Sequence, residues 1–211
     1  MASNLVFYTN PMSRGRIIRW MLEETGADYE TVVLDYASTM KEEPYLSINP
    51  MGKVPAIVHN GHVITECAAI CAYLADAFPE AGLAPPPTER ADYYRWLFFA
   101  AGPVEQAVTN TSMGFTPTEQ QQRMAGYGNY DLAVDTLEKA VSAHPYIAGD
   151  SFTAADVYIG SQVGWGTQFG TLPKRDAFTD YLGRIMSRDA CTRANDKDNA
   201  LMPAPEPAAA D

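Results

Sequence analysis

The stretch that most constrains the fold of this chain runs over residues 49–57, Asn-Pro-Met-Gly-Lys-Val-Pro-Ala-Ile, and continues through Asn60-Gly61. Asn-Gly is the dipeptide best suited to a type I′ hairpin turn, and short apolar runs flank it on both sides. Proline cannot donate a ladder hydrogen bond, so Pro55 belongs at the first position of a strand, where the Val54-Pro55 bond can be cis. A cis bond would turn the N–H and C=O of Val54 toward the space in front of the loop. An extended peptide can pair with them there as an added strand.

A helix is predicted to begin directly after this hairpin, at Glu66-Cys67. The first N–H groups of a helix lack internal partners and its dipole favours anions, so a carboxylate can bind at the N–H of Cys67. Glu66 adds a negative charge beside that position, and Lys53 can hold a second carboxylate. Each charge alone would be an ordinary solvated side chain. Together with the Val-Pro step and the hairpin, they indicate a short extended peptide with charged ends as the ligand.

These motifs, residues 49–57 and 66–70, resemble the glutathione site of the cytosolic glutathione transferases, here of a bacterial, serine type. A further point of similarity is the capping box Thr153-Ala-Ala-Asp156, with Phe152 before it, which in that family is a folding element and not a catalytic one. The resemblance covers nearly all of residues 4–200.

The resemblance also implies roles for the residues of the two motifs. Val54, before Pro55, would pair with the cysteinyl backbone of glutathione, and Lys53 would approach the glycyl carboxylate. Glu66 and the N–H of Cys67 would hold the γ-glutamyl end. The family usually has Ser at the position of Cys67. A backbone contact survives that change, whereas a hydroxyl contact does not carry over.

Strand and helix patterns alternate over the first part of the chain, in the order strand, helix, strand, short helix, strand, strand, helix. This order contains a βαβ crossover followed by an antiparallel hairpin, which requires a mixed sheet with helices on its faces. It predicts an α/β thioredoxin-like domain over residues 1–80, with strands at 5–9 and 29–34, an irregular stretch at 36–48, and helices at about 13–26 and 66–78.

Residues 81–88 are rich in Pro and Ala and are predicted to form an interdomain linker. No strand pattern follows, so residues 89–202 are predicted to form an all-helical domain with long helices at 89–110, 118–143 and 154–169. Pro103 should kink or break the first of these helices. The tail at 203–211 is of low complexity and is expected to be disordered.

Composition excludes several classes of function. The chain has 211 residues, with 26 acidic against 15 basic side chains, and its net charge of -11 opposes binding to nucleic acid or anionic membranes. The longest apolar run is far below the ~20 residues of a membrane-spanning helix. Three cysteines without framework spacing, and an N-terminus without a secretory signal, predict a cytoplasmic protein. The local exception to the charge is Arg14, Arg16 and Arg19, which either lie near an anionic ligand or form a solvated helix face.

Glutathione transfer requires the ligand's thiol as a thiolate, which a hydroxyl donor or a helix N-terminus stabilises. Ser13, at the first turn of the first helix, can offer both effects, although a plain capping role is equally compatible with its position. The family's serine-type members place the active residue there. Tyr8 is the rival, because tyrosine-type members use a phenol near that position, and Thr9 and Asn10 are weaker alternatives.

A second pocket is predicted to receive an apolar electrophile, with Met12, Trp96, Trp165 and Phe169 as its lining. Each of these side chains alone is more often part of a core. The aromatic residues at 93–99 are too many for one helix face, which together with the family resemblance predicts a homodimer.

Two other candidate sites are weak. His59 and His62 flank the hairpin turn, but two ligands without a third nearby do not make a zinc site, so no metal is expected. Cys67 and Cys71 are interpreted as small buried residues, although Cys67 near the ligand can in principle form a mixed disulfide.

The sequence therefore predicts a glutathione transferase that conjugates reduced glutathione to apolar electrophiles in detoxification. The alternatives are a glutathione-dependent isomerase, a disulfide reductase or peroxidase on the same site, and a non-catalytic glutathione-binding module.

Overall fold

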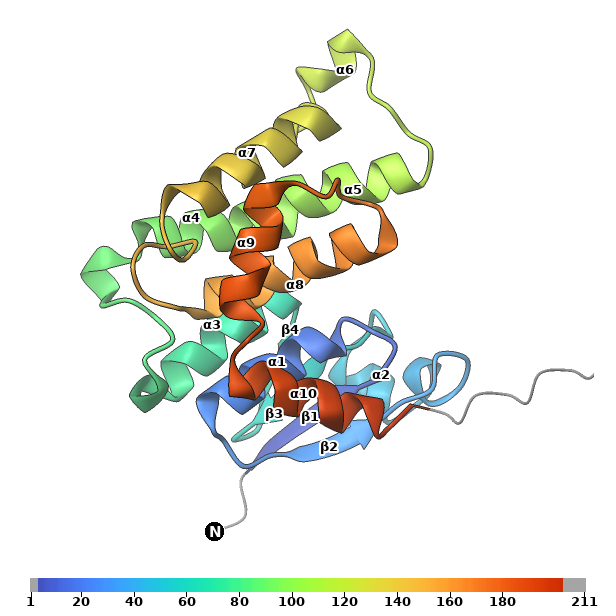
Figure 1. Cartoon of the computed structure of the whole chain (residues 1–211). Coiled ribbons are helices and arrows are strands. Elements are labelled where there is room, and N and C mark those ends of the chain that lie inside the picture. The colour runs from blue at the N-terminus through green and yellow to red at the C-terminus, as the bar shows by residue number, and fades with distance from the viewer. Residues whose placement is uncertain (1–3, 203–211) are drawn as a thin grey trace, which may run out of the picture.

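The computed structural model of the chain describes residues 4–202 (Figure 1). The tail expected to be disordered at 203–211 lies outside the described residues. The N-terminal part forms a four-stranded sheet in the order β2-β1-β3-β4. Strand β1 (Leu5–Thr9) pairs in parallel with β2 (Glu30–Val33) and antiparallel with β3 (Ala56–His59), which pairs antiparallel with β4 (His62–Thr65). The predicted mixed sheet of a thioredoxin-like fold is confirmed.

Alternate residues of β1 face opposite sides of the sheet, because side chains alternate along a strand. Leu5 and Phe7 are buried in the main core with helices α1 (Gly15–Thr25) and α3 (Cys67–Ala77). Tyr8 points to the other face, where its ring lies 5.5 Å from that of Tyr45 at the start of the short helix α2 (Tyr45–Ile48). Gly26 ends α1 in the left-handed conformation, and Asn60 and Gly61 both have positive φ, as the predicted hairpin turn requires.

The rest of the described chain is helical. Its helices are α4 (Ala91–Phe99), a π-helical stretch (Ala100–Val104), α5 (Glu105–Ser112), α6 (Glu119–Gln122), α7 (Tyr130–Ala143), α8 (Ala154–Phe169), α9 (Asp176–Ile185) and α10 (Asp189–Asn199). The π-helical stretch contains Pro103, which cannot donate an i→i−4 bond, so the predicted disturbance at that proline is confirmed. None of these helices, among the residues described, is long and apolar enough to cross a bilayer.

The single helix predicted over residues 118–143 is wrong. The chain leaves helical geometry after α6 and passes Gly128 at φ +66°. Helix α7 then starts afresh at Asn129, whose side-chain oxygen accepts from the N–H of Leu132 at 2.8 Å. The physical reason is local, since a left-handed glycine followed by an N-cap asparagine terminates one helix and begins the next.

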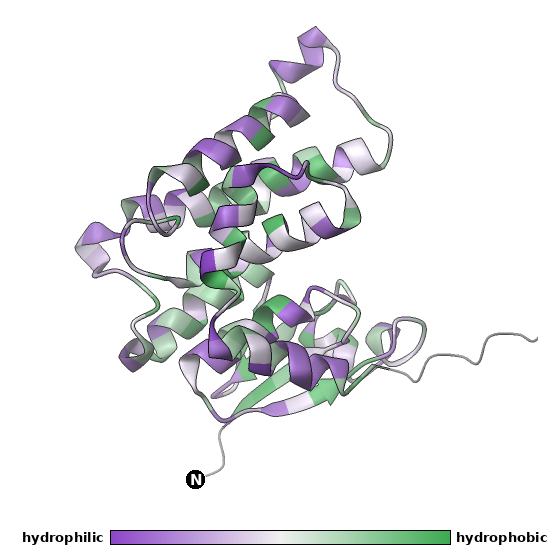
Figure 2. Ribbon diagram, viewed as in Figure 1, coloured by the Kyte–Doolittle hydropathy of each residue, from purple (hydrophilic) through white to green (hydrophobic). Residues whose placement is uncertain are grey.

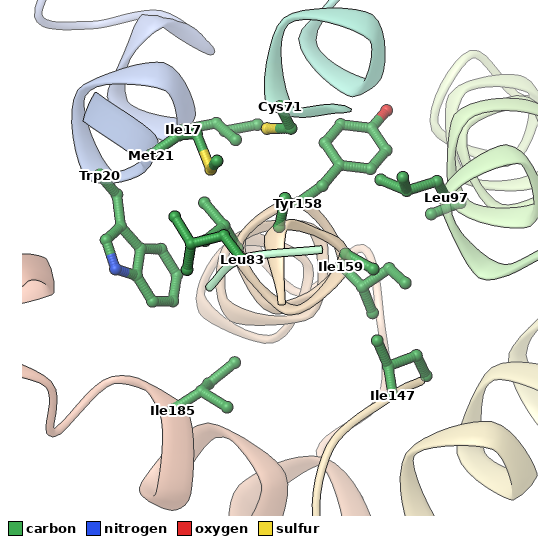
Figure 3. Close-up of a cluster of buried hydrophobic side chains, with 14 of the residues drawn as sticks. Ile17, Trp20, Met21, Cys71, Leu83, Leu97, Ile147, Tyr158, Ile159 and Ile185 are labelled. Atoms are coloured by element: carbon green, nitrogen blue, oxygen red, sulfur yellow. The ribbon is translucent and has the colours of Figure 1, made fainter. Parts of the chain in front are cut away.

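Helix α8 is the centre of the core that joins the sheet to the helical part. Figure 3 shows Tyr158 and Ile159 of α8 among side chains from α1, α3 and α4, including Ile17, Cys71 and Leu97. Polar residues concentrate instead on outer elements such as α6 and α10 (Figure 2).

The start of α8 is fixed by Asp156, which is fully buried. One carboxylate oxygen, Oδ1, accepts from the N–H of Ile147 at 2.8 Å and from the hydroxyl of Tyr181 at 2.9 Å. The other, Oδ2, accepts from the N–H of Thr153 at 2.9 Å. The predicted capping box is confirmed, and it also ties the preceding loop and α9 to the start of α8.

Helix α10 returns to the beginning of the chain and packs along α1 (Figure 1). Arg19 of α1 and Asp198 of α10 form a buried ion pair, with Nε and Oδ1 3.1 Å apart. One turn further along α1, Glu23 binds both Arg193 and Lys197 of α10. The first and last helices of the described chain are therefore held together by charge pairs.

Candidate functional site

A cavity of about 880 Å³ lies between the two parts of the chain. The first turn of α1 and the loop before β3 form one side, and the ends of α8, α9 and α10 form the other. The volume is within the range of small-molecule sites. It brings together these residues singled out from the sequence: Met12, Ser13, Lys53, Val54, Trp165 and Phe169.

Ser13 lies just before α1, with its side chain held on both sides. Its hydroxyl donates to the carbonyl of Asn10 at 2.7 Å, and its Oγ accepts from the N–H of Gly15 at 2.9 Å. The hydroxyl therefore satisfies the first N–H of α1 and also faces the cavity. A sulfur placed beside it would compete with the Asn10 carbonyl for the hydroxyl proton.

The rivals of Ser13 occupy other surroundings. Tyr8 is not among the residues that line the cavity and packs instead with Tyr45 and Ala56 on the far face of the sheet. Thr9 is fully buried. The side chain of Asn10 fixes the turn, because its amide donates to Leu34 O at 2.9 Å and its Oδ1 accepts from the N–H of Met12 at 2.9 Å.

The loop before β3 is held rigidly from within. The side-chain amide of Asn49 donates to the carbonyl of Lys53 at 2.8 Å, and its oxygen accepts from Met51 N–H at 3.1 Å. Gly52 has φ +57°, and a Cβ added there would meet the carbonyl oxygen of Met40 at 2.9 Å, so only glycine fits. The Val54-Pro55 bond is cis. Among the described residues the N–H and C=O of Val54 have no hydrogen-bond partner, so both groups are free for a ligand.

Glu66 carries a feature that the sequence did not predict. It is the N-cap of α3 and adopts φ +65° and ψ +120°, in the region that favours glycine. Such a conformation costs about 1–3 kcal/mol in a non-glycine residue and is typical of functional sites. No local pattern in the sequence signals it. Glu66, Cys67 and Pro55 are not among the residues that line the large cavity.

Cys67 nevertheless connects the start of α3 to the Ser13 loop, since its thiol lies 3.9 Å from the carbonyl oxygen of Arg14. Burial raises the pKa of the Cys67 thiol to about 12, and the pKa of the fully buried Cys71 thiol is also well above its usual value. Both remain protonated near neutral pH. Because the thiolate is the reactive form, this environment disfavours a mixed disulfide at Cys67.

The three arginines of the N-terminal segment have different roles. Arg14 forms an ion pair with Glu105. Arg16 lines the cavity and binds Pro11 O and Asn199 Oδ1. Arg19 is only 3% exposed and is paired with Asp198, so it neither contacts a ligand nor lies on a solvated helix face. The expectation was wrong for Arg19 because the packing of α10 on α1 covers that position.

The apolar wall of the cavity comes from α8 and from the elements that follow it. Trp96 does not line it, because its ring packs edge-on against Phe99 with centroids 5.6 Å apart and lies under the guanidinium of Arg95. The prediction for Trp96 is therefore not supported by the geometry. Cavity residues that sequence reasoning missed are Pro11, Tyr36, Met40, Gly164, Gln168, Leu182, Met186, Asn195, Asn199 and Met202. The spacing of Phe178, Tyr181 and Ile185 would have revealed α9, but not which residues face the cavity.

The two histidines of the hairpin take part in ordinary packing. His59 Nδ1 lies 3.0 Å from the hydroxyl of Tyr73, and its ring stacks on Phe78. Within residues 4–202, no group of three or more His, Cys, Asp or Glu side chains is placed to hold a metal ion.

Comparison with known proteins adds an independent line of argument. The family model for the glutathione S-transferase N-terminal domain matches residues 3–76. Glutathione S-transferase GST-4.5 of Xanthomonas campestris is 31% identical over 183 residues, which cover 81% of this chain and 89% of that protein. GstA of Escherichia coli O157:H7 is 29% identical over 154 residues, which cover 68% of this chain and 73% of that protein.

Two solved structures superpose on nearly the full length of this chain. A glutathione transferase from Methylococcus capsulatus has a TM-score of 0.77 at 28% identity, covering 93% of this chain and 99% of that one. A sphingomonad glutathione S-transferase in complex with glutathione has a TM-score of 0.75 at 29% identity, covering 92% of this chain and 98% of that one.

Proposed function

The chain belongs to the glutathione S-transferase family and is a transferase enzyme, and from this we propose that it conjugates reduced glutathione to apolar electrophiles through a thiolate held beside Ser13. The observation that carries the proposal is the single cavity that contains Ser13, the free backbone groups of Val54, and the apolar wall at Trp165 and Phe169. A nucleophile site and a site for an apolar partner therefore face one space.

In this proposal the tripeptide lies along the loop before β3. Its cysteinyl backbone pairs with Val54 as an added strand, and Lys53, which has no acidic partner among the described residues, faces the glycyl carboxylate. The γ-glutamyl end lies at Glu66 and the first N–H groups of α3. The glutathione held by the sphingomonad relative supports glutathione as the ligand.

The reaction then needs few groups from the protein. The glutathione thiol loses its proton to solvent, and the Ser13 hydroxyl, turned from Asn10 O toward the sulfur, stabilises the thiolate. The sulfur attacks the electrophilic carbon. A C–S bond forms, and the leaving group departs with its bonding electrons.

The cellular context follows from the same proposal. All three cysteines are free, which suits the reducing cytoplasm where glutathione is abundant. A role in detoxification fits conjugation of apolar electrophiles. We also propose the division into a glutathione-binding domain at 1–80, a linker at 81–88 and a helical domain at 89–202.

Lys53→Ala and Glu66→Ala are each expected to weaken glutathione binding by about tenfold or more, because a hydrogen bond to a charged group contributes ~1.5–3 kcal/mol. Calorimetric titration with reduced glutathione measures the effect. Lys139→Ala, an exposed lysine on α7 away from the cavity, is the matched control. Unchanged affinity in both site variants would contradict the proposed glutathione site.

The reaction type is tested separately. Turnover of peroxides or mixed disulfides in place of electrophiles would reassign the reaction to a reductase.

The protein is also expected to be a two-fold dimer. Phe98 and Tyr94 of α4 are 71% and 41% exposed, and Val63 of the edge strand β4 is 47% exposed. A stable dimer buries at least ~1,200 Å² in total, and these side chains offer an apolar centre for such an interface. Phe98→Glu should shift the sedimenting species at micromolar concentration toward the 23.1 kDa monomer. Met124→Glu, at a position 83% exposed near α6, should leave the dimer intact. A monomeric wild type would contradict the prediction.

A further inference from the structure

The charge of the cavity is opposite to that of the whole chain. The chain carries a net charge of -11, yet the residues that line the cavity include Arg14, Arg16 and Lys53 and no acidic side chain among those described. A low-dielectric cleft lined by one sign of charge concentrates ligands of the other sign. The cavity therefore favours anionic ligands in a protein that otherwise repels them.

Two of the three cations already have a role. Arg14 is neutralised by Glu105, which also accepts from the amide of Gln162 at 3.0 Å. Lys53 faces the glycyl carboxylate in the proposed function. Arg16 is the cation that remains.

Arg16 is oriented by hydrogen bonds to neutral groups and forms no ion pair among the described residues. Its Nε donates to Pro11 O at 2.6 Å, and its Nη2 donates to Asn199 Oδ1 at 2.8 Å. Within residues 4–202, Nη1 of Arg16 has no hydrogen-bond partner, and its guanidinium forms no ion pair. The neighbouring acid, Asp198, is committed to the buried Arg19. A guanidinium fixed in this way is preorganised for a carboxylate, since little side-chain entropy is left to lose.

Large apolar side chains form another part of the cavity wall. Phe169 at the end of α8 is 71% exposed and Met12 before α1 is 59% exposed, and both line the cavity with Trp165 and Met186. Exposed large apolar side chains around a cavity mark a surface that a ligand covers. The ligand that matches this wall and Arg16 together has an apolar or aromatic body with an acidic group at one end.

We propose that the second substrate is an apolar or aromatic electrophile that carries a carboxylate, which Arg16 binds together with the amide N–H of Asn199. This rests on the proposed function, because it assigns the partner of glutathione in the same cavity. With an aryl chloride, for example, the thiol loses a proton to solvent, the C–S bond forms, the C–Cl bond breaks and chloride leaves with the electron pair. The carboxylate takes no part in these bond changes and serves for recognition.

The test compares a chloronitrobenzoate with its methyl ester, which share the reacting carbon and differ in the negative charge. Wild-type enzyme should have the higher kcat/KM for the acid after correction for the uncatalysed rates. Arg16→Gln should lower the ratio of acid to ester kcat/KM by about tenfold or more, the effect of losing a hydrogen bond between charged groups. Arg16→Lys should restore part of the ratio, because it keeps the charge without the planar fork.

Two controls make the outcome decisive. Arg123→Gln removes the same charge from an exposed position directly after α6, outside the cavity, and should leave the ratio unchanged. Binding of unreactive nitrobenzoate to the wild type and to Arg16→Gln, followed by calorimetry, needs no turnover. A protein that binds nitrobenzoate through Arg16 but conjugates neither compound would overturn the proposed function and keep the acidic-ligand site. A protein that conjugates the ester as well as the acid, with the ratio unmoved by Arg16→Gln, would overturn the inference alone.

Discussion

Ser13→Ala is expected to lower the turnover of glutathione conjugation by about 10–10³-fold, since removing one preorganised donor to a developing or bound anion has an effect of this size. The loss should be partial. In the wild type, the N–H of Gly15 donates to Ser13 Oγ at 2.9 Å. The substitution frees this N–H, which can then donate to the sulfur. The pKa of enzyme-bound glutathione should rise in the variant, and ultraviolet titration of the bound thiolate measures it.

Tyr8→Phe is the matched comparison. Because Tyr8 packs against Tyr45 outside the cavity lining, loss of its hydroxyl should change neither turnover nor the bound thiolate appreciably. If the phenylalanine variant loses the thiolate while the alanine variant keeps it, the enzyme is of the tyrosine type and the role proposed for Ser13 is wrong.

Asp156→Ala is expected to lower the free energy of unfolding by on the order of 3–5 kcal/mol. The carboxylate is the common acceptor for Ile147 N–H, for the N–H and hydroxyl of Thr153 and for the Tyr181 hydroxyl, and all four donors lie in the interior. Removing the acceptor leaves them unsatisfied, which costs more than the loss of the bonds alone. The midpoint of urea unfolding measures the change.

Asp150→Ala, an exposed acid in the loop that precedes α8, provides the control for Asp156→Ala. Asp156→Asn should lose less stability, because its amide oxygen can still accept from one or two of the donors. Equal midpoints for Asp156→Ala and Asp150→Ala would show that the buried network contributes little.

The parts of the fold that could be predicted from the sequence are those with local signals. Strand β1 (Leu5–Thr9), the Asn60-Gly61 turn and α8 (Ala154–Phe169) each depend on residues close together in the chain, and all were predicted at or near their observed bounds. The break before α7 also had a local signal, at Gly128-Asn129, which the helical periodicity over 118–143 obscured.

The candidate site was predictable where it depends on the motif at 49–57 and on the turn before α1. Ser13, Lys53 and Val54 do line one cavity. The position of Arg19 and the cavity wall from α9 and α10 were not predictable, because they depend on where the end of the chain packs. Trp96 was misplaced for a related reason, since the direction of a helix face is set by its neighbours and not by its own sequence.

The ion pair between Arg19 and Asp198 joins residues 179 positions apart, which has a consequence for biosynthesis. Translation proceeds at about 5–20 residues per second, so the ribosome needs roughly ten seconds or more after making α1 before Asp198 exists. During that interval α10 does not yet cover Arg19, so the guanidinium stays hydrated, because burying it without the carboxylate of Asp198 would be strongly unfavourable. The face of α1 around Arg19 is therefore expected to stay open to solvent or to a chaperone, and to be covered only when the last helix has left the exit tunnel.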